Sequence, residues 1–479
     1  MERAHTQQTN SQPESSAPQA ATNGKSGPQS PQFLFFAQKE CWPPDTGQKL
    51  RNYYLARELA RRARVTYMGF SENGDRPAPT RGTSSKNSPD PFLSPNPPSA
   101  HPPNSIESVC QRVVYVPRDR GNTLLKIMWG AVGRKPLPVL NYKTPAMTQQ
   151  LTQLLEGQRF DLVQVESVHL AEYLPIIRAS RHRLFTVCDW HNVESELMWR
   201  YSERGPTIAH RFYAKITARR LEEIELRMLR DFDAHTVVSE RDRDRLLELA
   251  PQAKVQVIEN GVDSDYYSDP EIERAYATWR HKTHPHVQAD GAGPSSGRRR
   301  VVFVGSMDYH PNVEAVVYFA REIWPSVCGR RPDLVFTVVG RNPAPEVIAL
   351  ANINGIEVTG TVPDVRPYYR EAVASVVPLR MGAGSRLKIL ESMAAGVPVI
   401  STRLGAEGLE VKDGQTIILA ERRDEIADAL VSAASRDPQW RRLADGAREQ
   451  MRARYDWSVI GKRLFDLHMK SLKKRDNRL

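Results

Sequence analysis

Short apolar runs alternate with stretches of helical spacing along the first half of the chain. Phe33–Ala37 has the pattern of a buried strand, and the apolar residues after Gly47 recur at helical spacing. Further runs that predict strands are Val65–Phe70, Asp161–Val165, Leu184–Cys188, His235–Val238 and Val255–Ile258. Because strands and helices alternate, the pattern predicts a parallel sheet with helices on both faces.

A second series of the same kind begins near residue 301. Its predicted strands are Val301–Gly305, Leu334–Gly340, Ile356–Val358, Ala374–Pro378, Val399–Ser401 and Thr416–Leu419. The two series together predict an α/β protein with two doubly wound, Rossmann-like domains that face each other across a cleft. Ligands of such sheets bind at the carboxyl ends of the strands, where Gly305, Gly340 and Gly360 fall.

Polar stretches of low complexity divide the chain. Residues 1–30 are predicted to form a disordered tail, and about 75–104 a flexible insertion. Residues 281–300, rich in His, Gly, Pro, Ser and Arg, are predicted to be a linker. These boundaries give an N-terminal domain over 31–280 and a C-terminal domain over 301–479, which includes the final helices.

Composition narrows the class of protein. The 479 residues are 40% hydrophobic and 26% charged, which is typical of a globular chain. No apolar run approaches the roughly 18 residues of a membrane span, and no secretory signal begins the chain, so a cytoplasmic protein is expected. The scattered cysteines lack a C-x-x-C pair and are predicted to be core thiols: Cys41, Cys110, Cys188 and Cys328.

The formal net charge of +11 points to acidic partners, namely nucleic acid, an anionic membrane surface or phosphorylated substrates. The basic residues are spread over many segments, and no nucleic-acid-binding motif accompanies them. We therefore expect no nucleic-acid partner.

The segment Gly382–Ile400 has the pattern of an anion-binding loop and helix. Ser385 suits a helix N-cap, but Arg386 and Lys388 place two cations where a first helical turn prefers carboxylates. With free backbone N–H groups, these cations suit a phosphate or diphosphate. Glu391 shares a helix face with Lys388 and could accept hydrogen bonds from ribose hydroxyls. The alternative is a plain surface helix with a Lys–Glu pair.

Several short motifs occur in a characteristic order: Val237–Glu240, Val257–Asp263, Phe303–Gly305, Val339–Arg341, Val358–Val365, Gly382–Glu391 and Gly405–Leu409. In this order they resemble family 4 glycosyltransferases of the GT-B fold. Pro43–Arg51 is similar to the first-strand loop of members that make exported polysaccharides. The resemblance covers about Phe33 to Trp457, apart from the insertion.

The resemblance implies transfer of a sugar, with retention of anomeric configuration, from a nucleoside diphosphate sugar to a glycan or lipid-linked acceptor in surface polysaccharide biosynthesis. It implies no cofactor beyond this donor. Glu391 takes the place of the family's ribose-binding glutamate, while Ala383 stands where another glutamate usually touches the donor sugar. The implied donor-binding residues are Gly305, Arg341, Val362, Gly384, Ser385, Arg386, Lys388 and Glu391.

A departing nucleoside diphosphate gains negative charge, so fixed cations favour the transition state. Arg386 and Lys388 are therefore predicted to be catalytic, with no metal required. Asp263–Asp265 spells D-x-D, a metal-nucleotide motif of another glycosyltransferase fold, but its place between the domains favours a structural role.

Glu166 and His191 each follow a predicted first-domain strand and are candidates for acid/base chemistry or sugar binding. A satisfied loop carboxylate and a structural histidine are the alternatives. Gly47 and Lys49 could contact the acceptor or the diphosphate, unless Gly47 is a plain turn glycine.

The basic, amphipathic helix predicted over Gly47–Arg64 suits an anionic membrane surface, which would place the protein on the inner face of the cell membrane; a solvated outer face is the alternative. Competing functions are a GT-B sugar epimerase or phosphorylase, a non-catalytic nucleotide-sugar-binding protein and a nucleic-acid binder.

Overall fold

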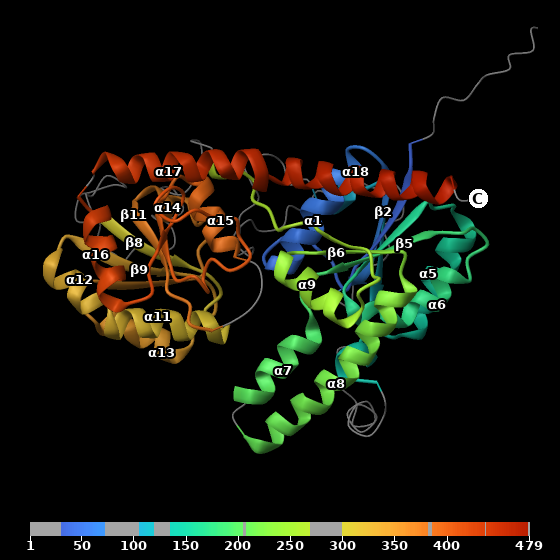
Figure 1. Cartoon of the computed structure of the whole chain (residues 1–479), viewed down its shortest axis with the longest axis horizontal. Coiled ribbons are helices and arrows are strands. Elements are labelled where there is room, and N and C mark those ends of the chain that lie inside the picture. Colours follow the sequence, from blue (N-terminus) through green and yellow to red (C-terminus); the bar gives the residue numbers. More distant parts are fainter. Residues whose placement is uncertain are drawn as a thin grey trace, which may run out of the picture. The chain divides into compact units, whose positions relative to one another are not determined.

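Two parallel sheets organise the protein, as a computed structural model shows (Figure 1). The structure describes residues 30–71, 105–118, 135–204, 207–268, 299–381, 386–435 and 437–477. Most of the predicted tail, insertion and linker therefore lies outside the described residues.

The first sheet has seven parallel strands in the order β3-β2-β1-β4-β5-β6-β7. Its strands are β1 Gln32–Phe36, β2 Arg64–Ser71, β3 Arg112–Pro117, β4 Leu162–Glu166, β5 Phe185–Trp190, β6 Ala234–Val237 and β7 Val255–Val257. All six predicted strands are confirmed. The edge strand β3 escaped prediction, because its valines are flanked by arginines and only one of its residues is buried.

The second sheet has six parallel strands in the order β10-β9-β8-β11-β12-β13. Its strands are β8 Arg299–Val304, β9 Leu334–Val339, β10 Ile356–Gly360, β11 Ala372–Val377, β12 Val399–Ser401 and β13 Ile418–Leu419. The predicted linker ended at Arg300, but β8 already begins at Arg299. The buried Arg300 donates from Nε to Glu371 Oε2 at 2.5 Å, so this end of the strand is ion-paired and not linker.

Helices connect the strands of both sheets. Those of the first half are α1 Gly47–Ala60, α2 Ile106–Val109, α4 Leu137–Leu140, α5 Pro145–Gly157, α6 Leu174–Arg178, α7 Glu194–Arg204, α8 Ile208–Asp231 and α9 Glu240–Leu249. Those of the second half are α11 His310–Glu322, α12 Trp324–Arg330, α13 Pro345–Ile348, α14 Arg366–Arg370, α15 Leu387–Ala394, α16 Arg423–Ala433, α17 Pro438–Gln450 and α18 Trp457–Asp476. Short 3-10 helices are η1 Val168–Tyr173, η2 Tyr266–Ser268 and η3 Ala349–Asn352, and η4 Met451–Tyr455 is a π-helical turn.

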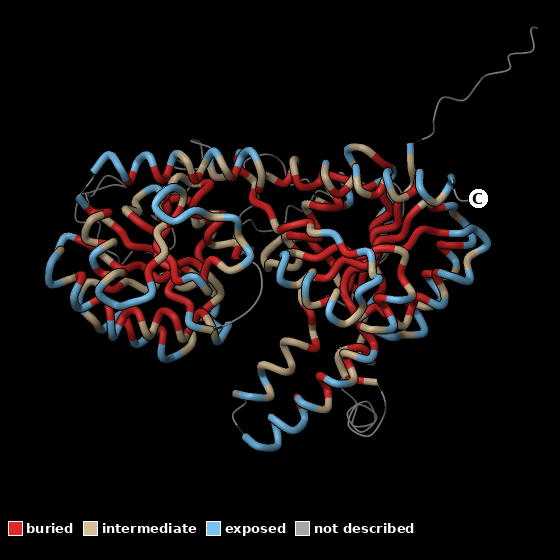
Figure 2. The backbone as a smooth tube through the Cα atoms, viewed as in Figure 1, coloured by how far each residue is buried: buried red, intermediate tan, exposed pale blue. Residues whose placement is uncertain are grey.

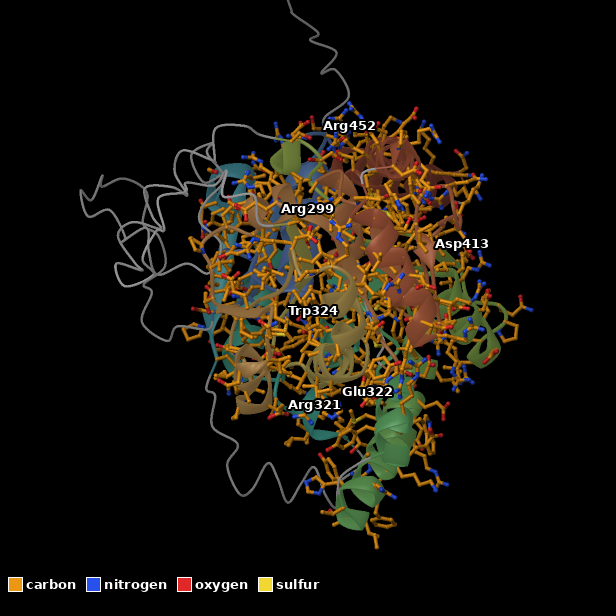
Figure 3. All side chains as sticks on the ribbon, turned by 90° about the vertical axis from the view of Figure 1, so that its left-hand side faces the viewer. Arg299, Arg321, Glu322, Trp324, Asp413 and Arg452 are labelled. Atoms are coloured by element: carbon orange, nitrogen blue, oxygen red, sulfur yellow. The ribbon has the colours of Figure 1, made fainter. Side chains whose placement is uncertain are left out.

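Alternation along each strand fills a core on both faces of its sheet. Phe33 and Phe35 of β1 pack with α1 on one face, whereas Leu34 and Phe36 pack with α5 and α8 on the other. In the second sheet, Trp324 is fully buried with its ring 5.8 Å from that of Phe336 on β9 (Figure 3). Figure 2 shows the buried strands at the centre of each domain.

The final helix differs from the predicted domain assignment. Ile460 and Leu464 of α18 are buried in the core cluster that contains Leu55 of α1, so α18 packs on the first domain and not on the second. Gly461 allows this close approach, because a Cβ there would lie 2.1 Å from the Cβ of Glu58 on α1. The chain thus returns to the N-terminal domain after residue 456.

Candidate active site at the end of the second sheet

Helix α15 carries the predicted anion-binding residues. Its N-cap is Arg386, which makes no side-chain capping bond, and the first turn contains no acidic residue. Gly384 and Ser385, together with Ala383, lie outside the described residues. Arg386 and Lys388 therefore lie at the positive end of the helix dipole, and the first turn supplies no carboxylate to balance these charges.

Lys388 lies at the carboxyl end of β8. Its Nζ donates to Asn312 Oδ1 at 2.5 Å and lies 4.1 Å from the centroid of the Phe303 ring. A Cβ on Gly305 would lie 2.8 Å from Asn312 Nδ2 and 3.2 Å from the same Nζ, so this glycine keeps space for both side chains. Burial, with the nearby charge of Arg386, lowers the pKa of Lys388 to about 7. An incoming anion would restore the charged form.

Glu391 lies one helical turn beyond Lys388 and points to a pair of tyrosines. Tyr369 donates from Oη to Glu391 Oε2 at 3.5 Å, and the hydroxyl of Tyr267 also bonds to this carboxylate. Burial raises the pKa of Glu391, while these bonds and Lys388 oppose that shift. The carboxylate has acceptor positions left for a ligand hydroxyl.

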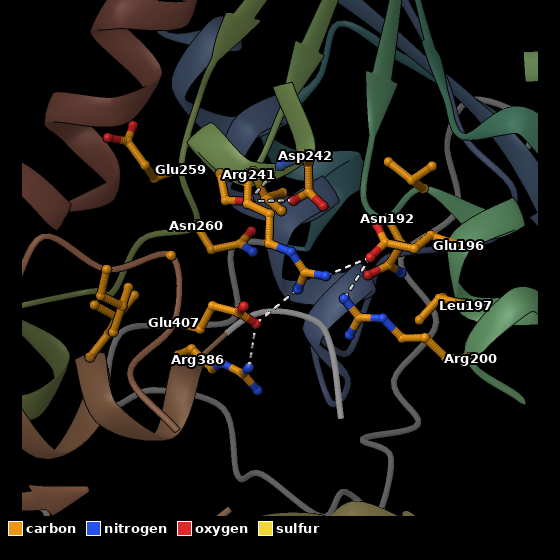
Figure 4. A pocket seen from close by; sticks show the side chains of 16 residues that line it. Asn192, Glu196, Leu197, Arg200, Arg241, Asp242, Glu259, Asn260, Arg386 and Glu407 are labelled. Atoms are coloured by element: carbon orange, nitrogen blue, oxygen red, sulfur yellow. Dashed lines mark hydrogen bonds and ion pairs between the residues drawn. The ribbon is translucent and has the colours of Figure 1, made fainter. Parts of the chain in front are cut away.

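Arg386 belongs to a chain of ion pairs that lines a pocket (Figure 4). Glu407 Oε2 accepts from Arg386 Nη2 at 3.4 Å and from Arg241 Nη1 at 3.0 Å. Glu196 Oε1 then accepts from Arg241 at 2.5 Å and from Arg200 at 2.6 Å. The pocket is lined by Asn192, Val193, Glu196, Leu197, Arg200, Val238, Ser239, Arg241, Asp242, Glu259, Asn260, Arg386, Leu390, Glu407, Gly408 and Leu409.

Glu407 leaves Arg386 incompletely satisfied. The guanidinium is buried, which lowers its pKa, and its Nε has no hydrogen-bond partner among the described residues. A buried donor without a partner is costly, so an anion with several oxygens would be a better partner for Arg386 than the single distant contact with Glu407.

The loop before α1 meets the second domain at Arg341. Asp45 forms ion pairs with Lys49, whose Nζ lies 3.4 Å from Oδ1, and with Arg341, whose Nη1 lies 3.6 Å from Oδ2. Thr46 caps α1 by accepting from the backbone N–H of Lys49, and Gly47 is the first helical residue. Asp45 thus links the predicted residues Lys49 and Arg341, and Gly47 begins the helix that carries Lys49.

Comparison with known proteins decides the family. Residues 46–266 match the family described as Glycosyltransferase Family 4, and residues 298–436 match the family described as Glycosyl transferases group 1. The chain belongs to the family 4 glycosyltransferases. In this family 4 chain the first match contains strands β2 to β7 of the first sheet, and the second contains all six strands of the second sheet.

Solved structures agree with this family 4 assignment in fold. The alpha,alpha-trehalose 6-phosphate synthase of Burkholderia multivorans is 13% identical, with a TM-score of 0.60 over 94% of this chain and 98% of that one. Anabaena HepE in complex with UDP-glucose is 14% identical, with a TM-score of 0.56 over 92% and 99% of the two chains. These likenesses confirm the predicted GT-B architecture.

A curated relative adds a sequence likeness. The phosphatidyl-myo-inositol mannosyltransferase of Mycobacterium leprae is 28% identical over 176 residues, which cover 36% of this family 4 chain and 46% of that protein. The chain spans about half the length of the curated relatives it matches.

Glu166 and His191 of this family 4 chain lie together at the end of the first sheet. Glu166 Oε2 and His191 Nε2 are 2.7 Å apart, and Gln164 donates to the other Glu166 oxygen at 2.7 Å. Burial raises the pKa of Glu166, with Asp189 adding to the shift, and burial lowers the pKa of His191 to about 4. The two side chains therefore form a hydrogen-bonded pair in which burial disfavours the charged form of each partner.

The sequence reasoning missed the ion pair beneath this dyad. Arg51 donates from Nε and Nη2 to the two oxygens of Asp189, each at 2.8 Å, and both side chains are almost fully buried. Burial opposes ionisation of Asp189, but the Arg51 charge prevails and lowers its pKa to about 2. Ligand atoms of Glu166, Asp189 and His191 cluster within 4.8 Å, yet Arg51 already supplies the cation there.

The predicted basic outer face of α1 is wrong for the first turns of the helix. Lys49 and Arg51 are buried, and Arg57 lies 4.4 Å from the centroid of the Tyr54 ring and 3.5 Å from Asp263. The D-x-D carboxylate Asp263 therefore holds an arginine and the Tyr54 hydroxyl, which agrees with the structural role favoured for that motif. Val362 is buried in a small apolar cluster, so its side chain contributes packing.

Proposed function

We propose that this family 4 protein transfers a sugar from a nucleoside diphosphate sugar to a glycan or lipid-linked acceptor, with retention of configuration, in the synthesis of a surface polysaccharide or glycolipid. The observation that carries the proposal is the placement of Lys388 Nζ beside Gly305, at the carboxyl end of β8, with Arg386 and Glu391 on the same short helix. A parallel α/β sheet binds nucleotides at this edge.

Arg386 and Lys388 would hold the diphosphate. Its oxygens would replace the Glu407 contact of Arg386 and give the unpartnered Nε an acceptor. Lys388 would regain full charge beside the phosphate, and Asn312 would keep the ammonium group in position. Glu391, held by Tyr369, would accept hydrogen bonds from the ribose.

Reaction requires that the bond between the sugar and the diphosphate oxygen breaks as an acceptor oxygen attacks the same face of the sugar. The acceptor proton then passes to the leaving phosphate oxygen. Arg386 and Lys388 stabilise the charge that develops on that oxygen, so no metal is required in this scheme. His191 is suited to binding a sugar hydroxyl, because Glu166 holds its Nε2 and the ring is the partly exposed member of this pair.

The named relatives support a sugar-nucleotide donor and a lipid acceptor. HepE was solved with UDP-glucose, and the Mycobacterium leprae relative is a mannosyltransferase that acts on phosphatidyl-myo-inositol by its name. A lipid-linked acceptor would place this protein at the inner face of the cell membrane. Among the described residues, no helix is both long and apolar enough to cross a bilayer.

A non-catalytic nucleotide-sugar-binding protein is the second candidate, because Ala383 offers no carboxylate to the donor sugar. A donor that binds without hydrolysis or transfer would favour this candidate. Slow hydrolysis of the donor in the absence of acceptor would favour the enzyme.

The test is a thermal-shift screen of nucleoside diphosphate sugars against the parent and two variants. We expect one donor to raise the melting temperature of the parent, and Glu391→Ala to remove most of that rise. Glu346→Ala, which changes an exposed glutamate on α13 of the same domain, is the matched control and should behave as the parent does. A parent that responds to none of the donors would contradict the proposal.

A further inference from the structure

Helices α7 and α8 form a hairpin that extends away from the first sheet (Figure 1). The two helices pack mainly on each other. Near the sheet, the inner face of α8 is buried through Leu221, Ile224 and Met228. Every residue of α8 from Ile208 to Tyr213 is exposed, and Figure 2 shows this end of the hairpin as exposed.

Large apolar side chains gather at this exposed end. Ile208 is 86% exposed and Phe212 65%, while Tyr213 and Tyr201 of α7 are each 44% exposed. These are four of the six strongly exposed large hydrophobic side chains among the described residues. Ile208 and Phe212 are one helical turn apart, so they form a continuous stripe. The term hairpin tip is used for these four residues together with the basic residues Arg211, Lys215 and Arg219.

A basic stripe runs beside the apolar one. Arg211, Lys215 and Arg219 follow each other at intervals of four residues, and all three are exposed. The sequence from Thr207 to Leu221 contains no acidic residue, whereas acidic residues return at Glu222. Charge is therefore segregated along α8, with the positive half at the hairpin tip.

We propose that the hairpin tip docks on the surface of an anionic lipid bilayer. Isoleucine and aromatic rings partition into the boundary between headgroups and acyl chains, and adjacent cations pair with anionic headgroups. The tip has both features in neighbouring stripes of one helix. A second copy of this chain fits less well, because two tips of the same positive charge would repel each other.

This surface replaces the basic face that the sequence predicted on α1, where Lys49 and Arg51 are buried. It does not depend on the proposed sugar transfer, because neither stripe contributes a residue to the pocket or to α15. The tip would instead hold the first domain close to lipid-borne acceptors.

Vesicle co-sedimentation of the full chain tests the proposal. Parent protein should bind vesicles of phosphatidylglycerol and phosphatidylcholine, and bind vesicles of phosphatidylcholine alone more weakly. The double variant Ile208→Ser/Phe212→Ser should lose about tenfold or more in partition coefficient. Arg211→Glu/Lys215→Glu should lose about tenfold or more on the anionic vesicles, with a smaller loss at high salt.

The matched control is Ile348→Ser, which removes a 55% exposed isoleucine from α13 of the second domain and should bind as the parent does. Unchanged melting temperatures would show that the variants fold, because all the substituted side chains are exposed. Equal vesicle binding by parent and hairpin variants would overturn the proposal. So would a parent that binds no vesicles but self-associates in sedimentation through Ile208 and Phe212, since the occupant would then be a second copy.

Discussion

Lys388 makes donor affinity dependent on pH in a direction that the structure determines. In the free protein, burial and the neighbouring Arg386 hold its pKa near 7. A bound diphosphate favours the ammonium form and raises the pKa, so binding takes up a proton wherever the free lysine is neutral. Affinity should therefore be highest below the free pKa of about 7 and fall as the pH rises above it.

The size of this effect follows from the same shift. With a free pKa of about 7, roughly one lysine in ten is charged at a pH one unit higher. If only the charged form binds well, affinity falls about tenfold per pH unit above 7, or about 1.4 kcal/mol. Below pH 7 the curve should level off.

Isothermal titration calorimetry between about pH 6 and about pH 8, in buffers of different ionisation enthalpy, measures both the affinity and the proton taken up. A nucleoside diphosphate sugar is the suitable ligand, because its phosphates do not titrate in this range. Lys388→Met should weaken binding and remove the slope, and Lys388→Arg should remove the slope because a guanidinium stays charged. A flat profile for the parent would refute the reasoning, and an unchanged slope in Lys388→Met would assign the proton to another group.

Two further predictions concern stability. Gly340→Ala should destabilise the second domain in urea unfolding, because the new Cβ would lie 1.7 Å from the carbonyl oxygen of Gly305; Gly329→Ala, in the open space of helix α12, should be neutral or stabilising by up to about 1 kcal/mol. Arg51→Met should cost about 3–5 kcal/mol near neutral pH, because it leaves Asp189 buried without its partner. Because the pKa of Asp189 is lowered to about 2, the pair should stabilise the fold at every pH above the usual aspartate pKa, and this contribution should be lost as the pH falls toward 2. An Arg51→Met variant as stable as the parent would contradict this account. So would a difference in stability between parent and variant that is already lost near pH 6.

The core strands of both sheets could be predicted because they are buried on both faces. Such strands need continuous apolar runs. Short runs such as Phe33–Phe36 and Val301–Val304, each bounded by polar loops, therefore predict buried strands. Edge strand β3 lacks a continuous apolar run, because only one of its residues is buried in the core. The anion-binding pattern around Arg386 and Lys388 was also local, since it depends on cations where a helix prefers carboxylates.

Positions that depend on distant partners could not be predicted. The sequence pattern placed Arg51 on a basic helix face. In the structure Arg51 is buried, because it pairs with Asp189, which lies 138 residues away in the sequence. Helix α18 follows the second domain in sequence, yet its apolar face is buried on α1 of the first. Only the tertiary structure also distinguishes exposed from buried apolar residues on α8, because apolar residues recur at helical spacing in both halves of that helix.

By itself, therefore, the sequence determined the two parallel sheets, their order along the chain and the cationic helix α15, because each depends on residues close in sequence. The tertiary structure alone decided which charges are buried in pairs, which domain holds the last helix and where apolar side chains remain exposed. Those outcomes depend on contacts between segments far apart in the chain, and a local sequence pattern does not indicate which distant residues a segment will contact.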